Sequence, residues 1–122
     1  MSTLDAGERR QDVVIRYYPH TPDGDLIYEL SELGYYVHQR ETTQGLDDFA
    51  SNSIYYGDLV DVRDIQLVAR FLMDNGIEIR QITPSRYHAD WKANAIEIGA
   101  SVDAQSFDVM TLEDIELFRK AL

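Results

Sequence analysis

One pattern of strand, helix and strand occurs twice along this chain, each time over about 30 residues, the length of a β-α-β unit. In both copies a helix ends at a glycine and leads straight into a strand, as LGYYV after the first helix and NGIEI after the second. Two such units in tandem are typical of ferredoxin-like folds. Right-handed crossovers would place both helices on one face of an antiparallel sheet, with the first and third strands in its centre. We therefore expect an α+β fold with a ferredoxin-like βαββαβ core.

Caps and hydrophobic spacing mark the ends of the two crossover helices. Thr21 is the expected N-cap of the first helix, which ends at Gly34. Asp61 is the expected N-cap of the second helix, which ends at Asn75 and Gly76. Alternating β-branched and aromatic residues predict the first four strands in the segments DVVIRYY, YYVHQRE, NSIYY and IEIRQI.

Two further elements follow the repeated units. The segment NAIEIGA is predicted to be an added fifth strand that pairs as a hairpin with the fourth. Thr111 and Asp114 have the S/T-x-x-D/E spacing of a helix start, so a C-terminal helix follows. Its residues Ile115, Phe118 and Leu122 share one face, which could dock on the sheet of the same domain or on a partner.

The chain has the size and composition of one folded domain. Residues 1–11 are small, charged and aperiodic and are predicted to be a flexible N-terminal tail, so the single domain spans residues 12–122. There are no cysteines, which excludes disulfides and thiolate zinc sites. No apolar run suits a signal peptide or a bilayer span, so we expect a cytoplasmic protein that does not associate with membranes.

No segment carries a recognisable catalytic or cofactor motif. The aspartates of SNSIYYGDLVDVRD precede a helix, where they would repel a phosphate, so we interpret them as caps rather than as an anion or metal site. His20, His38 and His88 have no metal-ligand spacing. We expect a protein that is not an enzyme and that binds no cofactor or metal, although groups far apart in the sequence could still converge.

Tyrosine pairs occur in each of the first three predicted strands. Because side chains alternate across a strand, one set should face the helices: Val13, Ile15, Tyr17, Tyr35, Val37, Ile54, Tyr56, Ile77 and Ile79. The opposite, open face should then display Arg16, Tyr18, Tyr36, His38, Arg40, Tyr55, Glu78, Arg80 and Ile82. Arginine and tyrosine are enriched at protein interfaces. The predicted partner-binding residues are therefore Arg16, Tyr18, Tyr36, His38, Arg40, Tyr55 and Arg80.

The nature of the bound molecule stays open at this point. A protein partner or a second copy of the chain is one possibility, and a solvated face that binds nothing is another. A small-ligand or glycan sensor could use the same face, with Trp91 as a stacking platform. Nucleic acid is disfavoured by the net charge of −11 and by the lack of an RNP1-like pattern.

The segments LGYYV, SNSIYYGDLV, DIQLVARFLMDNG, IEIRQI and NAIEIGA resemble a small bacterial ferredoxin-like module. That module is found alone or appended to caspase-like and trypsin-like peptidases and to signalling proteins. The similarity covers about residues 13–100, and a more distant one links the chain to LytR C-terminal and SPOR-like domains. The resemblance implies an accessory, protein-interacting role in a bacterial multi-component system, with no catalytic residue.

Overall fold

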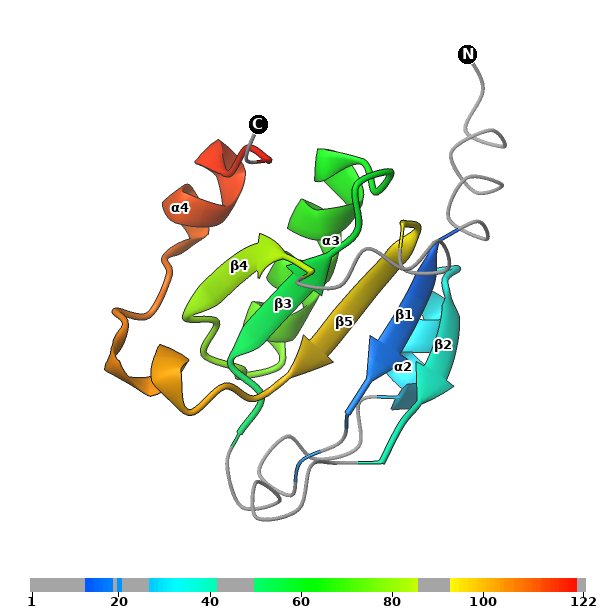
Figure 1. The fold of residues 1–122 in the computed structure, drawn as a ribbon, viewed down its shortest axis with the longest axis horizontal. Helices are drawn as coiled ribbons and strands as arrows, with labels where there is room; N and C mark the ends of the chain where they lie inside the picture. Colours follow the sequence, from blue (N-terminus) through cyan, green and yellow to red (C-terminus); the bar gives the residue numbers. More distant parts are fainter. Residues whose placement is uncertain (1–12, 19, 21–26, 42–49, 86–92, 121–122) are drawn as a thin grey trace.

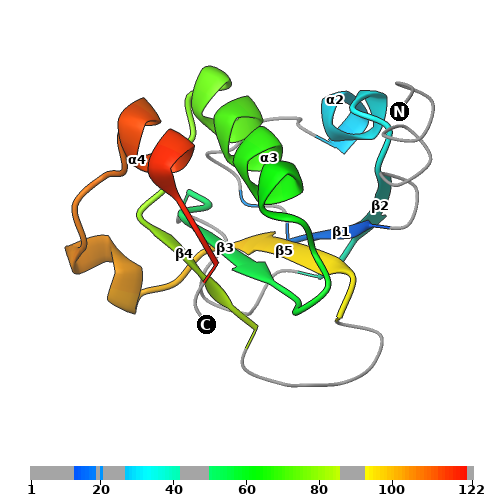
Figure 2. The ribbon, with the colours of Figure 1, turned by 90° about the horizontal axis from the view of Figure 1, so that it is seen from above.

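The computed structural model describes residues 13–18, 20, 27–41, 50–85 and 93–120. Within these ranges the chain forms one five-stranded sheet and helices on one side of it (Figures 1 and 2). The elements in chain order are β1 (Val14–Tyr17), α2 (Ile27–Glu32), β2 (Tyr36–Gln39), β3 (Ser53–Tyr56), α3 (Val62–Asp74), β4 (Gln81–Pro84), β5 (Ala95–Gly99), the 3₁₀ turn η3 (Asp103–Ser106) and α4 (Leu112–Leu117). The expected α+β class is confirmed. The expected tail and the start of the first helix lie outside the described residues.

The strand order differs from the ferredoxin-like one that the sequence predicted. The order is β2-β1-β5-β3-β4, and only the β3–β5 pairing is antiparallel (Figure 1). Each β-α-β unit is therefore contiguous, because β2 pairs directly with β1 and β4 pairs directly with β3. In a ferredoxin-like sheet another strand would separate them. Cap and periodicity signals are the same for both arrangements, so the sequence did not distinguish them.

The fifth strand occupies the centre of the sheet rather than extending an edge. β5 pairs in parallel with β1 and antiparallel with β3, so the predicted hairpin with the fourth strand is wrong. All five residues of β5 are buried. Ile96 and Ile98 lie on one side of β5, and Ala95, Glu97 and Gly99 lie on the other.

The core lies between the sheet and the helices, which share one face as expected (Figure 2). All nine side chains that alternation predicted to face the helices belong to this core or pack against it. The helix α3 contributes Ile65, Val68, Ala69 and Leu72. Gly76 ends α3 with a φ of +86°, a conformation that disfavours residues with a Cβ.

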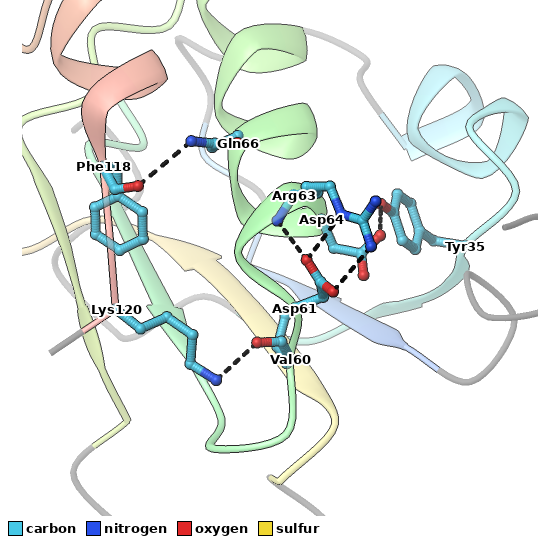
Figure 3. Close-up of polar contacts among 8 residues, drawn as sticks. All are labelled: Tyr35, Val60, Asp61, Arg63, Asp64, Gln66, Phe118 and Lys120. Atoms are coloured by element: carbon cyan, nitrogen blue, oxygen red, sulfur yellow. Dashed lines mark hydrogen bonds and ion pairs between the residues drawn. The ribbon is translucent and has the colours of Figure 1, made fainter. Parts of the chain in front are cut away.

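The aspartates that precede and begin α3 have structural roles (Figure 3). The Asp61 side chain accepts a hydrogen bond from the Arg63 amide at 2.8 Å and so caps the helix. Asp64 accepts a hydrogen bond from the Tyr35 hydroxyl at 2.7 Å, which ties the start of α3 to the segment before β2. These contacts confirm the interpretation of this segment as a capped helix start.

The C-terminal helix docks on its own domain. Thr111 and Asp114 form the predicted capping box, with reciprocal hydrogen bonds of 3.1 and 2.8 Å. Ile115 is fully buried, and the Phe118 ring meets the Tyr56 ring edge-on at 5.8 Å between centroids. Ile115 and Phe118 therefore dock on their own domain, against α3 and β3, whereas Leu122 lies outside the described residues.

Two polar side chains hold the residues after Ile115 in place. The Gln66 amide on α3 donates to carbonyl oxygens of the last turn, including that of Phe118 (Figure 3). The Lys120 ammonium donates to the carbonyl oxygens of Asp58 and Val60. Because α4 lies beside α3, it leaves the opposite face of the sheet uncovered by any described helix (Figure 2).

Candidate functional site

The face of the sheet opposite the helices, called the open face below, carries a polar row across all five strands. The pairing registers align His38 with Arg16, Arg16 with Glu97, Glu97 with Tyr55, and Tyr55 with Thr83. Aligned residues on neighbouring strands point to the same face, so these five side chains are direct neighbours. Three of them, Arg16, His38 and Tyr55, belong to the predicted partner-binding set.

Glu97 lies at the centre of this row and was not among the predicted site residues. Its side chain is only 7% exposed although no described helix covers it. The Tyr18 hydroxyl donates to its Oε2 at 3.2 Å, and the Ser85 hydroxyl donates to its Oε1 at 3.4 Å. A charged residue between Ile96 and Ile98 could have drawn attention to this position from the sequence alone. The burial of Glu97, however, follows from the central position of β5, which the sequence did not reveal.

Tyr18 reaches Glu97 by lying across β5. The side-chain atoms of Tyr18 lie 3.6–3.9 Å from the place where a Cβ on Gly99 would stand. These are ordinary van der Waals distances, so the Tyr18 side chain packs directly over Gly99. Tyr18 thus bridges β1 and β5 on the open face, and it is half-buried rather than available in full to a partner.

Burial raises the pKa of the Tyr18 phenol above its ordinary value, and the Glu97 carboxylate raises it further. Arg16 and Arg40 act in the opposite direction, which shows that both cations lie close to the phenol. The folded chain thus favours the neutral phenol more than the unfolded chain does. This contribution to stability is complete below the unfolded pKa of about 10 and is lost as the pH rises through the folded value.

We expect Glu97→Gln to lower the pKa of Tyr18, because the amide keeps the shape of the carboxylate but removes its negative charge. NMR titration of protein labelled at the tyrosine ζ carbons, with Tyr18→Phe to assign the signal, measures the change. Glu78→Gln is the matched control, since Glu78 is exposed and does not influence Tyr18. An unchanged or higher Tyr18 pKa in Glu97→Gln would contradict this assignment of the electrostatics.

The exposed part of the open face lies along β2. Tyr36 is 57% exposed, His38 and Arg40 are exposed, and the Tyr36 and His38 rings are in contact with 5.0 Å between centroids. We call these three residues and the neighbouring Arg16 the β2 margin. Beside it is a shallow depression of about 300 Å³ lined by Val14, Arg16, His38 and Ala95.

Two residues predicted for the open face, Arg80 and Ile82, are separate from the residues along β2. The Arg80 guanidinium donates to the Phe107 carbonyl at 2.6 Å, in the segment between η3 and α4, so Arg80 is not part of the β2 margin. Ile82 packs against the core and aligns with Ile54, which faces the helices. The predicted strand 77–82 begins only at Gln81, and the alternation of faces shifts between Ile79 and Ile82, since both contact the core.

The described residues contain no group of three or more side chains that could hold a metal ion. Within the same ranges, no helix is both long enough and apolar enough to cross a bilayer. A comparison of the chain with protein-family models, with curated proteins and with solved structures found no match. The resemblance to the bacterial module therefore stays a prediction.

Proposed function

We propose that this protein is a non-catalytic interaction module that binds a protein partner through the β2 margin. Following the resemblance described above, we place it as an accessory component of a signalling or regulatory system in the bacterial cytoplasm. Glu97, the buried acid of the open face, accepts hydrogen bonds from the Tyr18 and Ser85 hydroxyls, which supports a structural role for it. The exposed groups beside it are the ones offered to a partner.

The observation that carries this proposal is the exposure of cationic and aromatic side chains along β2 in a chain of net charge −11. Most cations elsewhere in the described chain have a partner. Arg63 forms an ion pair with Asp61, Arg80 donates to the Phe107 carbonyl, and Lys120 donates to the Val60 carbonyl. The Arg40 guanidinium has no hydrogen-bond or ion-pair partner among the described residues. Tyrosine and arginine are among the residue types enriched at binding hot spots.

The test compares two double variants that each remove one large exposed apolar side chain and one exposed arginine. Tyr36→Ala with Arg40→Ala alters the β2 margin, and Leu59→Ala with Arg70→Ala alters α3 and the loop before it. Tagged proteins are used to capture partners from cells that make the protein, and the affinity of a purified partner is then measured by calorimetry. We expect the first variant to bind at least about tenfold more weakly and the second to bind as the wild type does.

Equal binding by both double variants would contradict the proposal. A second candidate function, a small-ligand or glycan sensor, is favoured by the depression lined by Arg16 and His38. In the same experiment, a wild-type chain that captures no protein, but whose melting temperature rises with an anionic sugar or nucleotide, would support the sensor instead.

A further inference from the structure

The two edges of the sheet differ in how they are protected. At the β4 edge, Pro84 lacks a backbone donor, and the segment before α4 bonds to the chain leading into β4, with the Met110 amide 2.8 Å from the Ile79 carbonyl. β2 forms the other edge. It contains no proline, three of its four residues are exposed, and no described strand pairs with its outer side. An edge of this kind is able to accept another strand.

The backbone of β2 has donors and acceptors in position for such a strand. The Arg40 amide donates to the Tyr17 carbonyl of β1 at 2.8 Å, so its N–H points into the sheet. Successive residues of a paired strand direct their N–H and C=O groups to alternate sides. The backbone groups of Val37 and Gln39 therefore point away from β1, toward the free edge.

The charges beside this edge favour a partner segment with negative charge. Within the five strands, the described residues that face the open side include a single acid, Glu97, which is buried. Arg16 aligns with His38, and the Arg40 amide bonds to the Tyr17 carbonyl, so the two arginines lie near the C-terminal ends of β1 and β2. An incoming strand with carboxylate side chains would meet complementary charge there. A second copy of the chain carries the same net charge of −11, so two copies would repel each other.

We propose that the β2 edge takes up an extended acidic segment of the partner protein as a sixth strand of the sheet. This inference rests on the proposed function and states how the β2 margin recognises its partner. The backbone groups of Val37 and Gln39 bond to the segment, and its carboxylates lie beside Arg16 and Arg40. Main-chain bonds supply affinity in this mode of recognition, and the side chains supply selectivity.

The probe is an acetylated and amidated peptide of four Val-Glu repeats, with a Val-Lys peptide of the same length as the charge control. Amide shifts of ¹⁵N-labelled wild-type protein map where the peptide binds. We expect the largest shifts at Val37 and Gln39, and binding at least about tenfold weaker for the Val-Lys peptide. Largest shifts outside residues 35–41, or equal binding of both peptides, would overturn the proposal without any variant.

Gln39→Pro tests the backbone directly. Proline is tolerated on an edge strand where the N–H points outward, so this exposed position keeps its bonds to β1 while the donor is lost and the ring blocks the edge. Gln39→Ala is the matched control, because it removes the side chain and keeps the N–H. We expect at least about tenfold weaker peptide binding for Gln39→Pro and unchanged binding for Gln39→Ala.

The outcomes separate this inference from the proposed function. If Gln39→Pro still binds the captured partner normally while Tyr36→Ala with Arg40→Ala does not, the edge pairing is wrong and the β2 margin remains the interface. Wild-type self-association in light scattering that Gln39→Pro abolishes would make a second copy the occupant and overturn the acidic segment. Gln39→Pro needs an intact fold for this comparison, which circular dichroism checks.

Discussion

Replacing Ile54 with alanine is expected to lower the free energy of unfolding by about 2–5 kcal/mol. Ile54 is fully buried at the middle of β3, where it is aligned with Ile98 of β5 on one side and Ile82 of β4 on the other. The alanine would leave a cavity between three strands and the helices above them. Strands held by pairing on both sides cannot move to fill it.

Urea denaturation followed by circular dichroism measures this loss. Ile54→Val removes one methylene group and is expected to cost about 0.5–1.5 kcal/mol, which makes it the matched control. A loss of less than about 1 kcal/mol in Ile54→Ala would show that the core does not depend on this position. The comparison also checks that β3 directs Ile54 toward the helices rather than toward the open face.

Replacing Ile115 with alanine is expected to cost about 2 kcal/mol or more and to release α4 from the domain. α4 spans only Leu112–Leu117, and a helix of that length is unstable in isolation. Its stability therefore comes from docking, in which Ile115 is the fully buried side chain. The hydrogen bonds from Gln66 would lose their partners once the last turn moves away.

Leu117→Ala is the matched control in the same helix, because Leu117 is 66% exposed and its removal is expected to change stability by no more than about 0.5 kcal/mol. Hydrogen exchange of the Ile115 and Phe118 amides measures the release directly, since both amides are bonded within the docked segment. Equal exchange in the two variants would show that α4 does not depend on Ile115.

Local rules predicted the parts of the fold that depend on neighbouring residues. Alternation along β1 and β3 separated Ile15 and Ile54 from Arg16 and Tyr55, and the Thr111 cap marked the start of α4. Strand order depends instead on which distant segments pair. Nothing local distinguished a fifth strand at an edge from one between β1 and β3.

Only part of the candidate site was predicted, because its other part depends on which distant strands pair. Tyr36 and His38 lie on β2 and Arg40 follows its last residue, so alternation placed the three together. Arg80 was assigned by extending the alternation of a strand that begins only at Gln81, and its guanidinium bonds to the Phe107 carbonyl instead of joining the residues along β2. Burial of Glu97 required knowledge of both neighbours of β5.

The central position of β5 also bears on how the protein is made. Residues 95–99 are synthesised after the other four strands, yet they join the two β-α-β units into one sheet. Until they leave the ribosome, each unit is a two-stranded pair with one helix, and such small sheets are only marginally stable. Until then the nascent chain must keep two incomplete halves from pairing with other chains, and it becomes a cooperative domain only once β5 has joined them.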